Sequence, residues 1–173
     1  GRKDITEARE ILHTTYKFTS SAPTALRAMW ALHVTGGLDE KWLLEQTHDE
    51  REHIRMWAIK LLNDNGAPTK AALRRFVKLA QSDTAGLVQL ELASTLQRLP
   101  HAQRWELATA LVSHGKFAID PVLPLMIWYG INPAVPENRA EALKLIGKCK
   151  IPKIRQFIAR RLAGENSKAE DKE

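Results

Sequence analysis

Apolar residues recur along this chain with the period of an α-helix. In the segment REHIRMWAIKLL, an apolar residue stands at i, i+3, i+4, i+7 and i+8 from Ile54, which places all five on one helical face. The segment IPKIRQFIARRL has apolar residues at i, i+3, i+4 and i+8 from Ile154, again on one face. No stretch alternates apolar and polar residues with the two-residue period of a strand. The pattern therefore predicts an all-α fold.

Glycine and proline divide this pattern into helices joined by short loops. Proline is tolerated in the first turn of a helix because its missing N–H has no helical partner there. We therefore expect Pro23, Pro121 and Pro152 to open helices, and Thr69 and Thr84 to act as N-caps. The predicted helices span residues 5–14, 23–35, 39–48, 51–63, 69–82, 85–99, 102–114, 121–131, 137–149 and 152–163.

The predicted helices, about ten, pair into about five hairpins whose second helices share a motif. In this motif an apolar residue, followed by Arg in three of the five copies, precedes an apolar pair at the fourth and fifth later positions. Helical hairpins that recur every 28 to 35 residues are typical of an α-solenoid, in which neighbouring hairpins stack and share one core. The motif begins at Leu26, Ile54, Val88, Leu123 and Ile154.

The arginines of this motif are Arg27, Arg55 and Arg155. We interpret them as structural residues in partly buried surroundings, where an unpaired charge would be costly. Asp49 is a local partner for Arg55, whereas the other two have no carboxylate in the equivalent loop. Arg27 and Arg155 are therefore expected to bond helix-end carbonyls or a carboxylate of an adjacent hairpin. The alternative interpretation is a row of arginines that binds a ligand.

An uncharged segment, VLPLMIWYGINPAV at residues 122–135, raises the question of a membrane span. A spanning helix needs about 20 apolar residues, and Asp120 and Glu137 stand just outside this shorter segment. We therefore interpret it as the second helix of the fourth hairpin, packed between neighbouring helices. Gly130 is expected to allow a close helix approach, and Pro133 to end the helix.

Charge is distributed unevenly over the 173 residues. Residues 1–50 hold six basic and eight acidic side chains, whereas residues 51–163 hold eighteen and eight, a net charge of +10. Such a region could bind nucleic acid, anionic lipid or an acidic protein. No aromatic residues alternate with the charges in a base-stacking pattern, so we favour a solvated basic surface. Its candidate interaction residues are Arg74, Arg75, Lys78, Lys148, Lys150, Lys153, Arg160 and Arg161.

The sequence shows no recognisable catalytic chemistry. Nucleotide-binding, hydrolase and zinc-protease motifs do not occur. His48 and His53 flank the charged segment DERE, but zinc sites need tighter His or Cys spacing. The single Cys149 excludes an internal disulfide, a CxxC metal site and a CxxCH haem attachment. We therefore expect no catalytic, cofactor-binding or metal-binding residue in this chain.

Five tryptophans fall one to a helix and mostly on apolar faces, so core packing is favoured over an aromatic ligand-binding set. They are Trp30, Trp42, Trp57, Trp105 and Trp128.

The hairpin motif resembles HEAT repeats, whose second helix commonly carries an apolar–Arg pair. Four segments together, residues 24–62, 87–100, 123–136 and 151–163, resemble one family of large exported proteins. These are planctomycete and verrucomicrobial proteins labelled as membrane-bound dehydrogenases. Their usual plan is a β-propeller similar to sugar dehydrogenases, a HEAT-repeat region, and a C-terminal c-type cytochrome with CxxCH. This chain resembles the HEAT region alone.

The resemblance implies that residues 1–163 form a non-catalytic HEAT-like interaction or spacer module of a multidomain protein. Residues 164–173 are expected to form a polar, disordered tail. Dehydrogenase activity and haem c would belong to other domains of the parent, which is expected in the periplasm or at a membrane. The expected partners are those domains or another protein, with no small-molecule substrate. The chain itself is expected to be a soluble fragment without a signal peptide.

The alternative function is a basic HEAT-like solenoid that binds nucleic acid, similar to the HEAT-like alkylpurine DNA glycosylases. Such an enzyme would need an acidic residue and aromatic side chains in a basic groove. Trp57 and Trp128 are the candidate aromatics, but their spacing places them in the helical core and no carboxylate stands out beside them.

Overall fold

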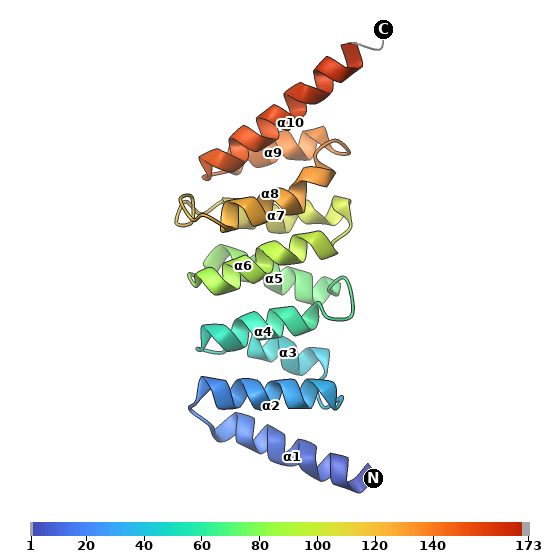
Figure 1. Cartoon of the computed structure of the whole chain (residues 1–173), viewed down its shortest axis with the longest axis vertical. Coiled ribbons are helices and arrows are strands. Elements are labelled where there is room, and N and C mark those ends of the chain that lie inside the picture. The colour runs from blue at the N-terminus through green and yellow to red at the C-terminus, as the bar shows by residue number, and fades with distance from the viewer. Residues whose placement is uncertain (1, 171–173) are drawn as a thin grey trace. The chain divides into compact units, whose positions relative to one another are not determined.

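The computed structural model describes the backbone of residues 2–170 and the side chains of residues 4–164. Over that range the chain forms ten α-helices and three short 3-10 helices, with no strand (Figure 1). The prediction of an all-α fold is therefore confirmed. Contacts divide the chain into two units, Gly1–Asn65 and Gly66–Glu173, and each is described by itself.

The first unit consists of two helical hairpins. α1 packs against α2, α3 packs against α4, and α2 also contacts α4. Tyr16, Met29, Leu43 and Ile54 lie in the shared core of these helices. The helices are α1 (Arg2–Phe18), α2 (Ala22–Val34), α3 (Glu40–Gln46) and α4 (Glu52–Leu62).

The second unit contains three further hairpins in two layers. α7 packs against both α5 and α9, and α8 packs against both α6 and α10, so first helices lie beside first helices and second beside second. The α-helices are α5 (Lys70–Ser82), α6 (Gly86–Thr95), α7 (Arg104–Val112), α8 (Leu123–Ile131), α9 (Arg139–Lys148) and α10 (Pro152–Glu170). The 3-10 helices are η1 (Leu96–Arg98), η2 (His101–Gln103) and η3 (Asn132–Ala134).

The repeated motif falls on alternate helices, as the predicted pairing requires. Its copies lie in α2, α4, α6, α8 and α10, the second helix of each hairpin. The first apolar residue of every copy is buried, which explains why the position is apolar throughout. These residues are Leu26, Ile54, Val88, Leu123 and Ile154.

The uncharged segment forms α8 and η3, and α8 contacts helices α6, α7 and α10. Ile127 and Ile131 are fully buried. Gly130 lies so close to η1 that an added Cβ would be 2.5 Å from Cβ of Leu96. The predicted close approach and packing between neighbours are confirmed. Within the described residues, no helix combines the length and apolar character that crossing a bilayer requires.

The start of α8 differs from the prediction. The helix begins at Leu123 rather than Pro121, and Pro124 occupies its first turn. A carboxylate oxygen of Asp120 accepts hydrogen bonds from the backbone N–H groups of Val122 and Leu123, both at 2.8 Å. Asp120 thus satisfies N–H groups that lack helical partners, and Pro121 stays in the turn before the helix.

Among the other predicted helix boundaries, the start of α5 agrees with the structure, whereas the start of α6 and the end of α10 differ from it. Thr69 caps α5 by accepting a hydrogen bond from the N–H of Ala72, as predicted. Thr84 does not cap α6; Asp83 instead accepts from the N–H of Ala85 in the turn before that helix. α10 continues to Glu170, so the predicted tail, residues 164–173, overlaps its end. Residues 171–173 lie outside the described residues.

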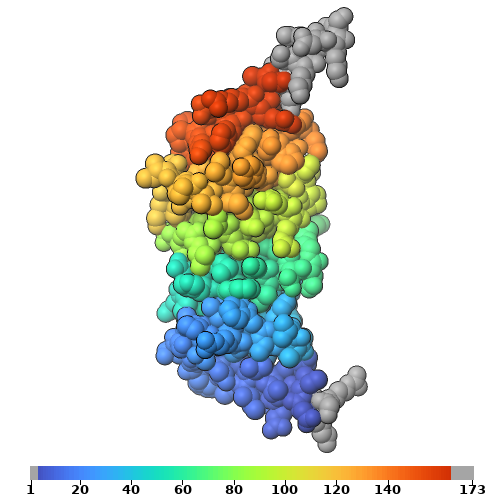
Figure 2. Space-filling view, viewed as in Figure 1, coloured from blue at the N-terminus to red at the C-terminus, as the bar shows by residue number. Residues whose placement is uncertain are grey.

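The linker between α7 and α8 projects from the second unit, at the left edge of Figure 2. Ile119 in this linker is 96% exposed. The base of the linker is held in place because the ammonium group of Lys116 donates a 2.8 Å hydrogen bond to the carbonyl of Thr84.

Candidate functional site

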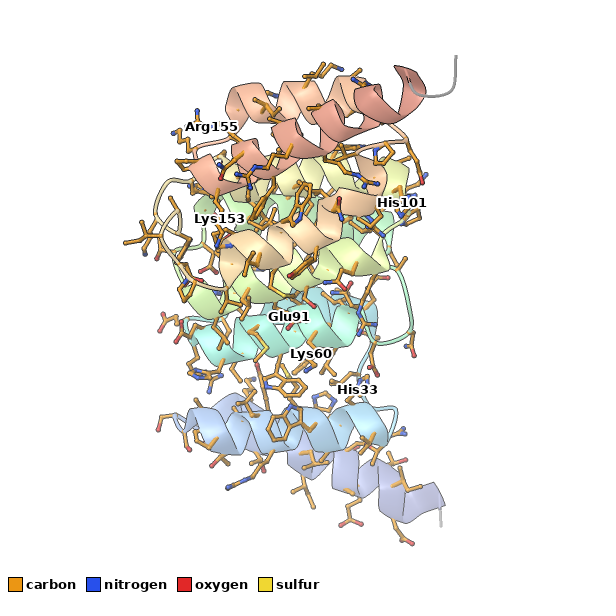
Figure 3. The ribbon with its side chains drawn as sticks, turned by 45° about the horizontal axis from the view of Figure 1, so that its top comes forward. His33, Lys60, Glu91, His101, Lys153 and Arg155 are labelled. Atoms are coloured by element: carbon orange, nitrogen blue, oxygen red, sulfur yellow. The ribbon has the colours of Figure 1, made fainter. Side chains whose placement is uncertain are left out.

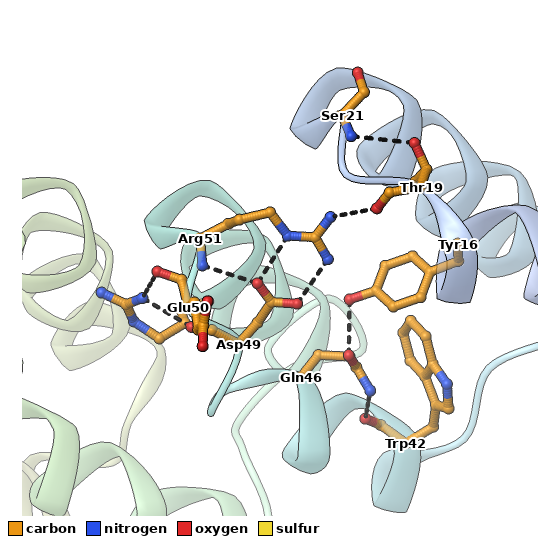
Figure 4. Close-up of polar contacts among 9 residues, drawn as sticks. Tyr16, Thr19, Ser21, Trp42, Gln46, Asp49, Glu50 and Arg51 are labelled. Atoms are coloured by element: carbon orange, nitrogen blue, oxygen red, sulfur yellow. Dashed lines mark hydrogen bonds and ion pairs between the residues drawn. The ribbon is translucent and has the colours of Figure 1, made fainter.

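A polar network ties the two hairpins of the first unit together (Figure 4). The guanidinium of Arg51 pairs with the carboxylate of Asp49 at 2.8 Å and donates a 3.3 Å hydrogen bond to the carbonyl of Thr19. The same guanidinium lies 5.7 Å from the ring centroid of Tyr16. The Tyr16 hydroxyl donates a 2.7 Å hydrogen bond to Gln46. The network therefore connects the α1–α2 turn with the turn that precedes α4.

The electrostatics of this network are those of a structural ion pair. Burial, followed by the negative charge of Asp49, raises the pKa of Tyr16, so its hydroxyl stays protonated. Burial alone would raise the pKa of Asp49, but its hydrogen bonds from Arg51 outweigh that effect and lower it. The Asp49 hydrogen bond in turn raises the pKa of Arg51. Tyr16 therefore stays neutral, and Asp49 and Arg51 stay ionised, near neutral pH. Fixed protonation states suit holding a turn better than transferring protons.

The repeat arginines lie in different surroundings. Arg55 is half-buried, and its Nη1 donates 2.8 Å hydrogen bonds to the carbonyls of Asp49 and Glu50. The carboxylate of Asp49, the partner expected from sequence, is instead paired with Arg51. Arg27 and Arg155 are exposed, so the expectation of partly buried surroundings is wrong for both. Arg155 lies near the N-terminal end of α10 (Figure 3).

The predicted basic surface is spread over several elements of the second unit. Seven of its eight residues are exposed, and Arg75 is half-buried. Arg74, Arg75 and Lys78 lie on α5, Lys148 and Lys150 near the end of α9, and Lys153, Arg160 and Arg161 on α10.

The lone thiol lies at the end of α9. Cys149 is 4% exposed, and its Sγ donates a 3.3 Å hydrogen bond to the carbonyl of Ile151. Burial raises the pKa of Cys149, which disfavours the reactive thiolate. Within the part of the chain that the structure describes, no three His, Cys, Asp or Glu side chains gather as metal ligands would.

A cleft of about 1000 Å³ lies on the first-helix layer of the second unit, over α5, α7 and α9. Its floor includes Val77, Trp105 and Ala110, which are buried, and its rim carries exposed polar side chains. The hollow reflects the small side chains of Thr109 and Ala110 on α7 and of Ser113 directly after it, which lie between larger neighbours. We define this cleft by its lining residues: Lys70, Leu73, Val77, Gln81, Ala102, Gln103, Trp105, Glu106, Thr109, Ala110, Ser113, Asn138, Glu141 and Lys148.

Charges of both signs line the cleft. Lys70 and Lys148 contribute ammonium groups, and Glu106 and Glu141 contribute carboxylates, so the formal charge of the lining is zero. Glu141 also accepts a 2.6 Å hydrogen bond from Lys144. Of the eight residues in the predicted basic surface, Lys148 alone lines the cleft.

Trp105 is the one tryptophan in the lining and is 6% exposed. Its indole Nε1, a hydrogen-bond donor, has no partner among the described residues. Arg104, one residue earlier and also buried, donates to the carbonyls of Leu99 and Gly130 at 2.9 and 2.6 Å. An arginine thus satisfies nearby carbonyls while the neighbouring indole N–H stays unpaired, an uncommon state for a buried donor.

The other tryptophans pack against aromatic neighbours. Trp30 and Trp57 form an edge-to-face pair with centroids 4.8 Å apart, and Trp128 lies 5.3 Å from Phe157. Trp57 and Trp128 are half-buried, whereas Trp30 is 38% exposed. The expectation of core packing is therefore confirmed for Trp105, confirmed in part for the half-buried Trp57 and Trp128, and wrong for Trp30.

Sequence reasoning missed the cleft, although a signal for it was present. Ala102, Glu106, Thr109, Ala110 and Ser113 are spaced at i, i+4, i+7, i+8 and i+11, one helical stripe of mostly small or polar residues. Such a stripe facing away from the core is expected to leave a hollow where the flanking helices carry longer side chains.

Comparison of the chain with protein-family models, with curated proteins and with solved structures finds no match. Its function is therefore inferred from the residues and geometry described above and from the resemblance of its repeats.

Proposed function

We propose that this chain is a non-catalytic helical-repeat module of the HEAT-like solenoid type, which acts by binding protein. Three features support the proposal: the recurring second-helix motif, the pairing of helices into hairpins, and the two layers of helices in the second unit. Stacked hairpins of this kind offer extended surfaces for recognition.

The cleft of the second unit is the observation that carries the proposal. Protein interfaces combine an apolar centre with a polar rim of mixed charge. The cleft has this composition, with Val77 and Trp105 in its floor and both lysines and glutamates in its lining. Among the described side chains, the polar network of the first unit is internally paired and the lone thiol is buried, so neither offers comparable chemistry.

The resemblance of the repeats extends this proposal to a parent protein. In that protein the module would hold a propeller and a haem c domain in fixed geometry, and dehydrogenase or electron-transfer activity would lie in those other domains. The module would then be exported as part of its parent.

The gene that encodes the chain provides the first test. We expect it to specify CxxCH downstream of this segment and propeller-type repeats upstream. Each flanking segment is then expressed separately and titrated with the chain by isothermal calorimetry. Measurable binding of at least one segment supports the module, and the absence of both the motif and any binding would refute it.

Nucleic-acid binding is the second candidate, favoured by the net charge of +10 over residues 51–163. The cleft does not favour it, because Glu106 and Glu141 cancel the charge of Lys70 and Lys148, whereas phosphate binding needs net positive charge. We therefore expect a labelled DNA duplex to bind weakly, with binding lost by about 150 mM salt because few phosphates are neutralised together. Submicromolar affinity at that salt, measured by fluorescence anisotropy, would reverse the order of the two functions.

A further inference from the structure

We propose that the cleft over α5, α7 and α9 binds an extended peptide segment, with Trp105 Nε1 donating a hydrogen bond to a peptide carbonyl. This inference rests on the proposed protein-binding function and specifies its site and the chemistry of its ligand. The ligand is a polar stretch of polypeptide with a basic side chain near one end and a carboxylate near the other.

The dimensions of the cleft suit a chain segment. Its volume of about 1000 Å³ is at the upper end of the range for small-molecule sites, about 300–1000 Å³. The lining spans α5, α7 and α9 and also extends along these helices, from Lys70 to Gln81 on α5 and from Asn138, the N-cap of α9, to Lys148 at its end. An extended peptide fills such a space along its length, with side chains alternating toward and away from the floor.

The unpaired indole N–H points to an acceptor supplied from outside the chain. A buried donor without a partner costs about 1–3 kcal/mol, so its presence in a native fold calls for an explanation. Trp105 is buried, lines the cleft, and has no hydrogen-bond acceptor for Nε1 among the described residues. Because Nε1 is itself covered by protein atoms, a peptide carbonyl becomes its acceptor only when the indole turns toward the cleft as the segment enters.

The rim of the cleft suits a peptide backbone. Gln81, Gln103 and Asn138 place side-chain amides there, and all three residues are exposed. A primary amide carries both a donor and an acceptor, so Gln81 and Gln103 can pair with the N–H and C=O groups that an extended peptide presents at each residue. Asn138 offers its NH2 group, because its Oδ1 already accepts the N–H of Glu141 at 3.2 Å. Phosphate groups offer acceptors alone and would meet two carboxylates in the lining.

The charges of the cleft determine which way round the bound peptide lies. Because each hairpin reverses the chain, α7 and α9 run in the same direction, and their first turns carry Glu106 and Glu141. Lys148, the last residue of α9, lies at the opposite end. Lys70 opens α5 and offsets part of the acidic charge. Because Glu141 is already paired with Lys144, a basic residue of the ligand is expected near Glu106, and a carboxylate near Lys148.

The test uses the full 173-residue chain and a displayed library of random 12-residue peptides. Selected peptides are synthesised and titrated against the chain and three cleft variants. Thr109→Arg fills the hollow, Trp105→Phe removes the indole N–H but keeps an aromatic ring, and Glu106→Lys reverses a rim charge. Gln156→Arg, at an exposed position on α10, is the matched control. Circular dichroism melts establish that each variant is folded at the titration temperature.

We expect Thr109→Arg to weaken binding more than tenfold and Trp105→Phe about threefold to tenfold, the value of one hydrogen bond. Glu106→Lys should weaken peptides that carry a basic residue, while the control stays within about twofold of the parent chain. Selection of no peptide, or binding insensitive to Thr109→Arg, would overturn the proposed site. Unchanged affinity in Trp105→Phe would overturn the role of the indole N–H. If a flanking segment of the parent still binds the Thr109→Arg variant, the site fails while the module function stands.

Discussion

Two arginines hold the turn between α3 and α4 through different acceptors. Arg51 pairs with the carboxylate of Asp49, and Arg55 binds the carbonyls of Asp49 and Glu50. One turn residue, Asp49, therefore supplies a charged acceptor to the first arginine and a neutral acceptor to the second. The two contacts can be separated by substitution because they involve different atoms of Asp49.

The substitution Asp49→Asn tests how much the negative charge of Asp49 contributes to the stability of the fold. Asn keeps an oxygen that can accept the backbone N–H of Arg51, so the substitution mainly removes the ion pair. Because the folded-state pKa of Asp49 is lowered, its charge stabilises the fold above the unfolded pKa, and that stabilisation is lost as the pH falls below about 4. We expect the variant to be about 1–2 kcal/mol less stable than the parent at pH 7, with a smaller difference at pH 3.

Urea unfolding at the two pH values measures this difference. Glu45→Gln, which removes an exposed carboxylate from α3, is the control. A stability gap for Asp49→Asn that is as large at pH 3 as at pH 7 would show that the charge of Asp49 is not its source.

The repeat arginines should differ in their contributions to stability. Arg55 is half-buried and makes two charge-assisted bonds to carbonyls, so Arg55→Ala is expected to cost about 1–3 kcal/mol. Arg155 is exposed, and Arg155→Ala should change the free energy of unfolding by less than about 0.5 kcal/mol. Denaturant unfolding of both variants measures the contrast. Equal effects would mean that the shared motif position, rather than its local surroundings, determines the role of the arginine.

At the scale of elements, α8 shows how a single glycine sets a helix contact. The Gly130 carbonyl accepts a bond from Arg104, and its missing side chain lets η1 approach. Gly130→Ala would place a Cβ 2.5 Å from that of Leu96, so the helices must separate at an expected cost of about 1–3 kcal/mol.

Gly147 in α9 provides the matched control for this substitution. A Cβ there meets no atom within 4 Å, so Gly147→Ala should be neutral or stabilise the helix by up to about 1 kcal/mol. Thermal or denaturant unfolding of the two variants, each a Gly→Ala change within a helix, gives the comparison. A stable Gly130→Ala protein would contradict the tight contact between α8 and η1.

The elements were largely predictable from sequence, for identifiable reasons. Each second helix carries a buried apolar residue at the same motif position, so periodicity located all five. The starts of α6 and α8 were less predictable. Thr84 was the predicted N-cap and Pro121 the predicted first residue, but Asp83 and Asp120 accept the backbone N–H groups in these two turns. The cleft was missed because it depends on which outward side chains are small, a property of neighbouring helices together rather than of any one segment.

For the molecule as a whole, the chain by itself is expected to be colourless. Covalent attachment of haem c uses a CxxCH motif, and this chain has one cysteine, which is buried. Absorption spectra of the purified chain expressed with a cytochrome maturation system test this expectation. A Soret band that survives acid–acetone extraction would contradict it.

Because Cys149 is buried, the rate at which a reagent modifies its thiol measures how often the surrounding structure opens. The thiol lies between α9 and α10 and is 4% exposed. An alkylating reagent can therefore react with it only when these two helices open locally. We expect native labelling to be at least about tenfold slower than labelling in denaturant, each tenfold corresponding to about 1.4 kcal/mol of opening free energy. Equal rates would refute this protection. Because Cys149 is the only cysteine, mass spectrometry of the intact chain can follow the opening of one site without any engineered label.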